Sequence, residues 1–79
     1  MGDGHAKVIE LVQEGSWAAA HELVQQSSDK LSCLIHAYLH RVEGDASNAA
    51  YWYGRAGVKI PDDSPQIELE RLIRLAQDE

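Results

Sequence analysis

The chain has 79 residues, of which 44% are hydrophobic, and its 13 acidic and 7 basic side chains give a formal net charge of −6. This length accommodates one domain at most, and the hydrophobic fraction argues against disorder. The acidic balance disfavours nucleic acids and anionic membranes as partners, because both need clustered Lys and Arg. The single cysteine excludes an internal disulfide, and there is no membrane-length apolar run and no signal-peptide pattern, so we expect a cytoplasmic protein.

The first predicted hairpin covers about residues 5–27. Apolar side chains recur at helical spacing over 5–14, and Gly15 is expected to end this helix. Ser16 is then the predicted N-cap of a second helix over about 17–26.

The second predicted hairpin covers about residues 30–57. Its first helix, over about 30–43, has the broadest apolar face of the chain and stops at Gly44. Asp45 is a favourable N-cap for the next helix, over about 46–56.

A fifth helix is predicted over about 65–77, because Ser64 followed by Pro65 is typical of a helix start. Its inward face is formed by Leu69, Leu72, Ile73 and Ala76. No strand pattern is present, so we expect one all-α domain over residues 1–79, made of two helix hairpins and a C-terminal capping helix.

The two hairpins share a template in which a Gly and a small polar residue precede a helix and an Ala follows the Gly by five positions. The second copy resembles the second half of a tetratricopeptide repeat, on the residues Gly44, Asp45, Ala49, Tyr53, Ala56 and Pro61. The resemblance implies stacked helix hairpins, with Ala20 and Ala49 at the helix crossings, and a role in protein binding. It also implies an apolar inner face carrying Ile9, Val12, Leu34, Tyr38 and Val42. Either the capping helix or a second copy of the chain would cover this face, so a homodimer is one expectation.

A second, more local resemblance runs from His36 to Tyr53. The pattern HAYLHR-x-EGD-xx-NA-x-YWY is similar to a family of small, single-domain bacterial proteins. That family supports the helical fold and implies no chemistry.

One candidate metal site lies in the third predicted helix. Cys33, His36 and His40 share one face of this helix, and such side chains are zinc ligands. We favour packing against the fourth helix instead, because no second ligand cluster accompanies them and a structural zinc site needs a closed shell. No metal and no cofactor are therefore expected. The alternative is a metal or small-molecule site at these residues and the nearby aromatic side chains, and this alternative includes enzymatic activity.

Aromatic and arginine side chains are the candidates for a partner surface, because interfaces concentrate their energy in such anchors. They are Tyr51, Trp52 and Arg55 on the fourth predicted helix, with Tyr38 and Arg41 on the third. Packing of Tyr51 and Trp52 under the capping helix or under the turn over residues 57–63 is the competing interpretation. No nucleophile, phosphate loop or acid/base pair is recognisable. The sequence therefore favours a non-enzymatic interaction or assembly module with an unidentified protein partner.

Overall fold

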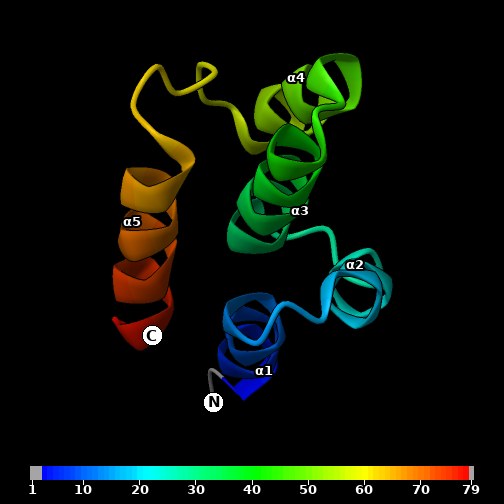
Figure 1. Ribbon diagram of the computed structural model, residues 1–79, viewed down its shortest axis with the longest axis vertical. Coiled ribbons are helices and arrows are strands. Elements are labelled where there is room, and N and C mark those ends of the chain that lie inside the picture. Colours follow the sequence, from blue (N-terminus) through cyan, green and yellow to red (C-terminus); the bar gives the residue numbers. More distant parts are fainter. Residues whose placement is uncertain (1–2, 79) are drawn as a thin grey trace.

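A computed structural model describes residues 3–78, with side chains described from His5 onward. This part of the chain is all helical, and it contains no strand (Figure 1). The helices are α1 (Asp3–Gln13), α2 (Trp17–Val24), α3 (Lys30–Glu43), α4 (Ala46–Ala56) and α5 (Pro65–Gln77). The predicted all-α class with five helices is confirmed. Within the described part, no helix combines the length and the hydrophobicity needed to cross a bilayer.

The helix ends follow local chemistry at most of the predicted positions. Asp45 and Ser64 accept hydrogen bonds from the backbone N–H groups three residues on, at 3.4 and 3.2 Å. Gly44 and Gly57 end α3 and α4 with φ of 86° and 77°, a conformation that other residues adopt only at a cost. Ser16 was expected to cap α2, but its side chain makes no capping hydrogen bond.

α5 covers the apolar face that the two hairpins leave open. It packs against α1 and α3, and its lower end lies beside α1 in Figure 1. The buried cluster that results draws on four helices, and its members are Val8, Ile9, Val12, Ala20, Val24, Ile35, Tyr38, Leu39 and Leu72. Of the predicted inner face, Val42 alone is exposed, at 40%, while Leu34 is partly buried. α5 therefore covers most of the predicted inner face, as expected for a capping helix.

α4 packs on α3 through small side chains. Ala49 is 3% exposed and lies in a second buried cluster with Ala37 and Tyr53, while Ala20 on α2 is fully buried. Burial of the two alanines agrees with their predicted place at helix crossings, because small side chains let helix backbones approach closely.

A buried carboxylate joins α3, α4 and α5. Glu68 is 1% exposed, and its two oxygens accept hydrogen bonds from Tyr53 Oη at 2.6 Å and from Arg41 Nη1 at 2.7 Å. Arg41 also donates to the backbone carbonyl of Asp63, whose carboxylate pairs with Arg71. Burial raises the pKa of the Tyr53 phenol, and its hydrogen bond to Glu68 raises that pKa further. The phenol therefore stays protonated as a donor.

Replacing Arg41 with leucine should lower the free energy of unfolding by about 3 kcal/mol, because removing one partner leaves a buried carboxylate unpaired. The double variant Arg41→Leu/Glu68→Leu should recover most of that loss. Arg74→Leu on α5 is the control, since Arg74 is exposed and has no ion-pair partner among the described side chains. Urea unfolding measures all three, and equal losses for Arg41→Leu and Arg74→Leu would contradict a structural role for the pair.

Candidate functional site

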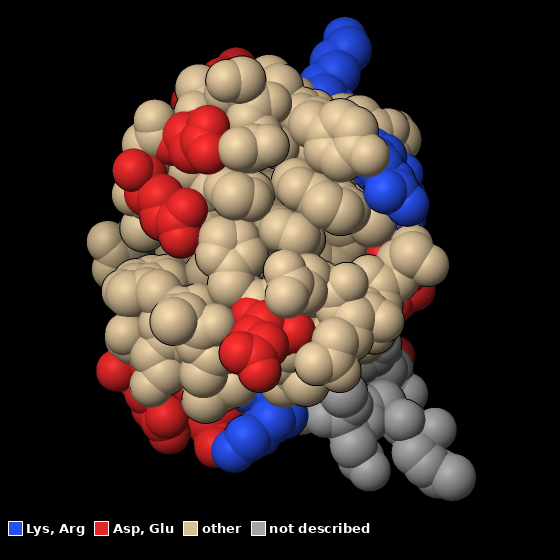
Figure 2. Space-filling model, turned by 90° about the vertical axis from the view of Figure 1, so that its right-hand side faces the viewer, with Lys and Arg blue, Asp and Glu red and all other residues tan. Residues whose placement is uncertain are grey.

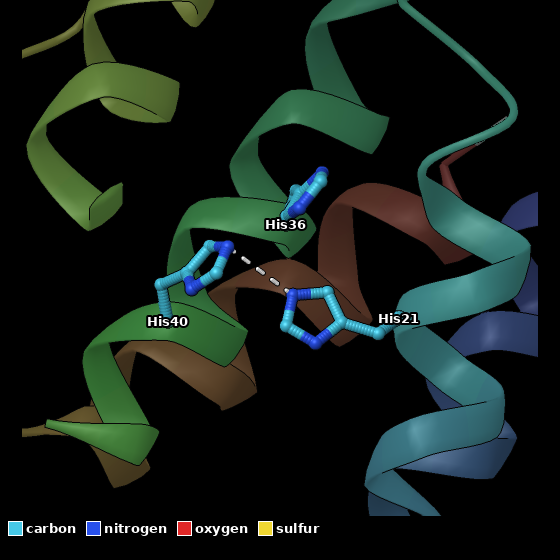
Figure 3. A group of neighbouring side chains, drawn as sticks. All are labelled: His21, His36 and His40. Carbon is cyan, nitrogen blue, oxygen red and sulfur yellow. Dashed lines mark hydrogen bonds between the residues drawn. The ribbon is translucent and has the colours of Figure 1, made fainter. Parts of the chain in front are cut away.

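Three imidazole rings meet between α2 and α3. His36 and His40 lie one turn apart on α3, so they share a face, and α2 packs against that helix and brings His21 to them. Figure 3 shows the three rings around one space, His21 from one helix and the other two from its neighbour. One ring nitrogen from each residue can be chosen so that the three atoms lie within 4.8 Å of one another.

The rings of His21 and His40 face each other through their Nε2 atoms. Their Nε2 atoms are 3.3 Å apart, as the dashed line in Figure 3 marks, and their ring centroids are separated by 4.6 Å. The His36 centroid lies 4.9 Å from that of His21 and 5.1 Å from that of His40. Imidazole nitrogens from two different helices therefore converge on one point, with a third ring beside them.

Carboxylates lie on the opposite edge of these two rings. Glu43 places Oε2 3.3 Å from His21 Nδ1 and Oε1 3.5 Å from His40 Nδ1. Asp45 Oδ2 is 3.6 Å from the same His40 nitrogen. His40 Nδ1 is buried and has no hydrogen-bond partner within the described residues. Each ring thus presents Nδ1 to negative charge and Nε2 to the shared space.

His36 is held against an aromatic side chain of α4. Its ring stacks on Trp52 with centroids 4.0 Å apart and planes inclined by 15°, and only 6% of the residue is exposed. Burial lowers the pKa of His36 to about 4, and the neighbouring His21 and His40 contribute to the lowering. The ring is therefore neutral at physiological pH and keeps a free lone pair.

The histidines are open to solvent on one side, through a groove of about 640 Å³ that we call the histidine groove. Its lining residues are Trp17, Ala18, His21, Glu22, Gln25, His36, His40 and Glu43. Figure 2 looks onto the side of the molecule on which α2 lies in Figure 1, and this side exposes mostly uncharged side chains with scattered acidic ones and basic ones near its edges. A small molecule or ion can therefore reach the rings without a change of fold.

The structure replaces one member of the metal set that the sequence offered as an alternative. His36 and His40 are together, as their spacing indicated, but Cys33 is not in the group of ligand atoms. Its buried thiol instead donates to the Ser28 carbonyl at 3.6 Å. His21 stands in its place and was missed, because helical spacing relates residues within one helix only. The stacking of the two hairpins, which the repeat resemblance implies, was the one signal that pointed to it.

The predicted partner residues divide into two groups. Tyr38 is 4% exposed in the core, and Arg41 forms an ion pair with Glu68, so both have structural partners inside the fold. Tyr51 is 54% exposed, Trp52 is half-buried and Arg55 is exposed. The Arg55 guanidinium carbon lies 5.1 Å from the Trp52 ring centroid and 5.9 Å from that of Tyr51. These last three form a continuous surface cluster on α4.

Comparison of the chain with protein-family models, with curated proteins and with solved structures gives no match. The tetratricopeptide resemblance and the resemblance to small bacterial proteins therefore stay predictions.

The metal-free protein should become less stable as the pH falls from about 6.5 to about 4. In this window the unfolded chain takes up a proton at His36, whose ordinary pKa is about 6.5, while the folded chain does not. More protons are then bound in the unfolded state, so stability rises with pH across the window. Urea midpoints measured in the presence of a chelator would show this slope.

His36→Gln should flatten that slope, because the amide does not titrate. His5→Gln should leave it in place, since His5 lies outside the three-ring group. The same slope in the parent and in His36→Gln would mean that another group is responsible.

Proposed function

We propose that this domain binds a divalent transition-metal ion, zinc among the candidates, through His21, His36 and His40. In tetrahedral zinc sites Zn–N distances of about 2.0–2.1 Å place neighbouring nitrogens about 3.3–3.4 Å apart. The 3.3 Å between His21 Nε2 and His40 Nε2 matches this separation. Imidazole nitrogens suit zinc, copper, nickel and iron, so the donor set defines a class of ions.

The observation that carries the proposal is the tautomer conflict between His21 and His40. A neutral imidazole has one N–H and one bare nitrogen. If either ring donates through Nε2 to the other, its own bare Nδ1 faces the Glu43 carboxylate, and two acceptors oppose each other. A cation between the two Nε2 atoms removes the conflict, because both rings then carry their proton on Nδ1, the nitrogen that faces the Glu43 carboxylate.

A proton shared between the two Nε2 atoms would also remove the conflict, but a metal ion explains more features of the site. A proton between two nitrogens needs no third ligand, yet the neutral His36 ring stands beside the pair with its lone pair free. Metal-bound histidines commonly donate their other N–H to a carboxylate, which fixes the tautomer and raises ligand basicity. Glu43 is in that position for two of the three rings.

Three protein ligands leave a coordination position for an outside group. Zinc sites of this kind hold water or a substrate in the remaining position, whereas structural zinc sites close with four protein ligands. Among the described residues no fourth ligand belongs to the group, and the histidine groove leads to it. The sequence alone favoured packing over metal because it showed no second ligand cluster to accompany the residues of one helix, and a third imidazole from a second helix changes that balance.

Untagged, chelator-stripped protein should bind one zinc ion per chain in calorimetry and native mass spectrometry. His21→Ala and His40→Ala should each abolish stoichiometric binding, and Glu43→Gln should weaken it by about 10–100-fold. The bound ion should raise thermal stability, by about 2.7 kcal/mol when free zinc is 100 times its Kd, and a chelator should reverse the gain.

His5→Ala is the matched control, because His5 lies outside the three-ring group. Its zinc stoichiometry and affinity should equal those of the parent. Parent protein without saturable zinc, copper, nickel or cobalt binding at neutral pH would sink the proposal.

A protein-interaction module, which the sequence favours, is the second candidate, and one observation supports it. Tyr51 keeps 54% of its surface exposed while Arg55 caps its ring, so α4 presents a preorganised aromatic and arginine anchor. The partner would be a protein with a neutral or basic surface, given the net charge of −6. A role as an enzyme is not proposed.

Tyr51→Ala should leave the melting temperature nearly unchanged while reducing recovery of any protein that co-purifies from the native cell. Ile67→Ala on α5 serves as control, because Ile67 is similarly exposed, at 51%, but lies on another helix. Recovery that is unchanged by Tyr51→Ala and by Arg55→Ala would place the contact elsewhere.

A further inference from the structure

A larger groove lies between α3, α5 and the segment that joins α4 to α5. We call it the α3/α5 groove, and its volume is about 780 Å³. Its lining residues are Lys30, Leu31, Leu34, Val58, Lys59, Ile60, Pro61, Asp62, Asp63, Glu68, Arg71, Leu72 and Leu75. None of the three clustered histidines lines it, so it is a separate feature.

The walls of the α3/α5 groove are mainly aliphatic. Leu31 and Leu34 come from α3, and Leu72 and Leu75 come from α5. Leu75 is 41% exposed, and Ile60 in the connecting segment is 57% exposed. Concave, largely apolar hollows of about 300–1,000 Å³ with a few polar groups are typical of small-molecule sites. A ligand that fits this lining has an extended aliphatic part.

The charges around the groove indicate which polar group the ligand carries beside its aliphatic part. Glu68 and Asp63 are already neutralised by Arg41 and Arg71. Lys30 and Lys59 are exposed and have no ion-pair partner among the described side chains, and Asp62 is the one lining carboxylate not held by an arginine. Lys30 and Lys59 therefore outnumber the one lining carboxylate that no arginine holds, which leaves a local excess of positive charge at this groove on a protein of net charge −6.

We propose that the α3/α5 groove binds a long-chain aliphatic carboxylate, with the alkyl chain against the leucine walls and the carboxylate at Lys30 and Lys59. A second copy of the chain fits less well, because two molecules of charge −6 repel each other. The inference is independent of the metal site, which lies on another face of α3 and shares no lining residue with this groove.

The test uses dodecanoate at a concentration below micelle formation, with a chelator present so that metal binding does not contribute. Calorimetry should show saturable binding, and the ligand should raise the melting temperature. Lys30→Gln/Lys59→Gln should weaken binding by about fivefold, in keeping with two exposed charge contacts. Leu75→Asp should weaken it more strongly, by placing a carboxylate on the apolar wall.

Matched controls separate this site from general hydrophobic or ionic attraction. Lys7→Gln and Ile67→Asp change an exposed lysine and an exposed α5 side chain outside the groove, and both should bind as the parent does. Dodecanol should bind more weakly than dodecanoate, and butyrate should not bind. Equal binding of dodecanol, or unchanged affinity in the Lys30→Gln/Lys59→Gln variant, overturns the assignment of the lysines. A concentration-dependent dimer that Leu75→Asp dissolves, with no dodecanoate binding by the parent, overturns the ligand in favour of a second copy.

Discussion

The arrangement of the helices depends on one buried carboxylate. A charge at the position of Glu68 is tolerated only if its oxygens are paired, and the guanidinium of Arg41 and the phenol of Tyr53 pair both. Because the three side chains come from α3, α4 and α5, satisfying the charge fixes where α5 lies on the second hairpin. The covered core and the groove between α3 and α5 both follow from that placement.

Local patterns in the sequence were enough to predict the helices. Gly44, Gly57 and Ser64 each carry their own signal, and the leucine face of the last helix predicts its docking. The Glu68 pair was not predictable in this way, because its partners lie 27 and 15 residues earlier and no periodicity relates them. From the sequence, Arg41 was therefore assigned to the partner surface.

Only part of the candidate site was predictable, because sequence spacing relates residues within one helix but not residues on different helices. The spacing of His36 and His40 within one helix predicted that they share a face. The addition of His21 required knowing how α2 and α3 pack side by side, which depends on small buried residues such as Ala20 rather than on any motif. α3 consequently carries histidines on one face and Leu31 and Leu34 on another, so one helix contributes to both grooves.

The helix that contributes His21 is the least self-sufficient of the five. α2 has eight residues and no side-chain hydrogen bond at its N-cap, whereas isolated helices below about 12–15 residues are marginal in water. An ion held by His21 and His40 would bind only while α2 lies on α3, and so it would oppose local opening of α2. The tighter the ion binds, the larger the free energy needed to open α2 locally. Amide exchange in this short helix would therefore report the occupancy of the site.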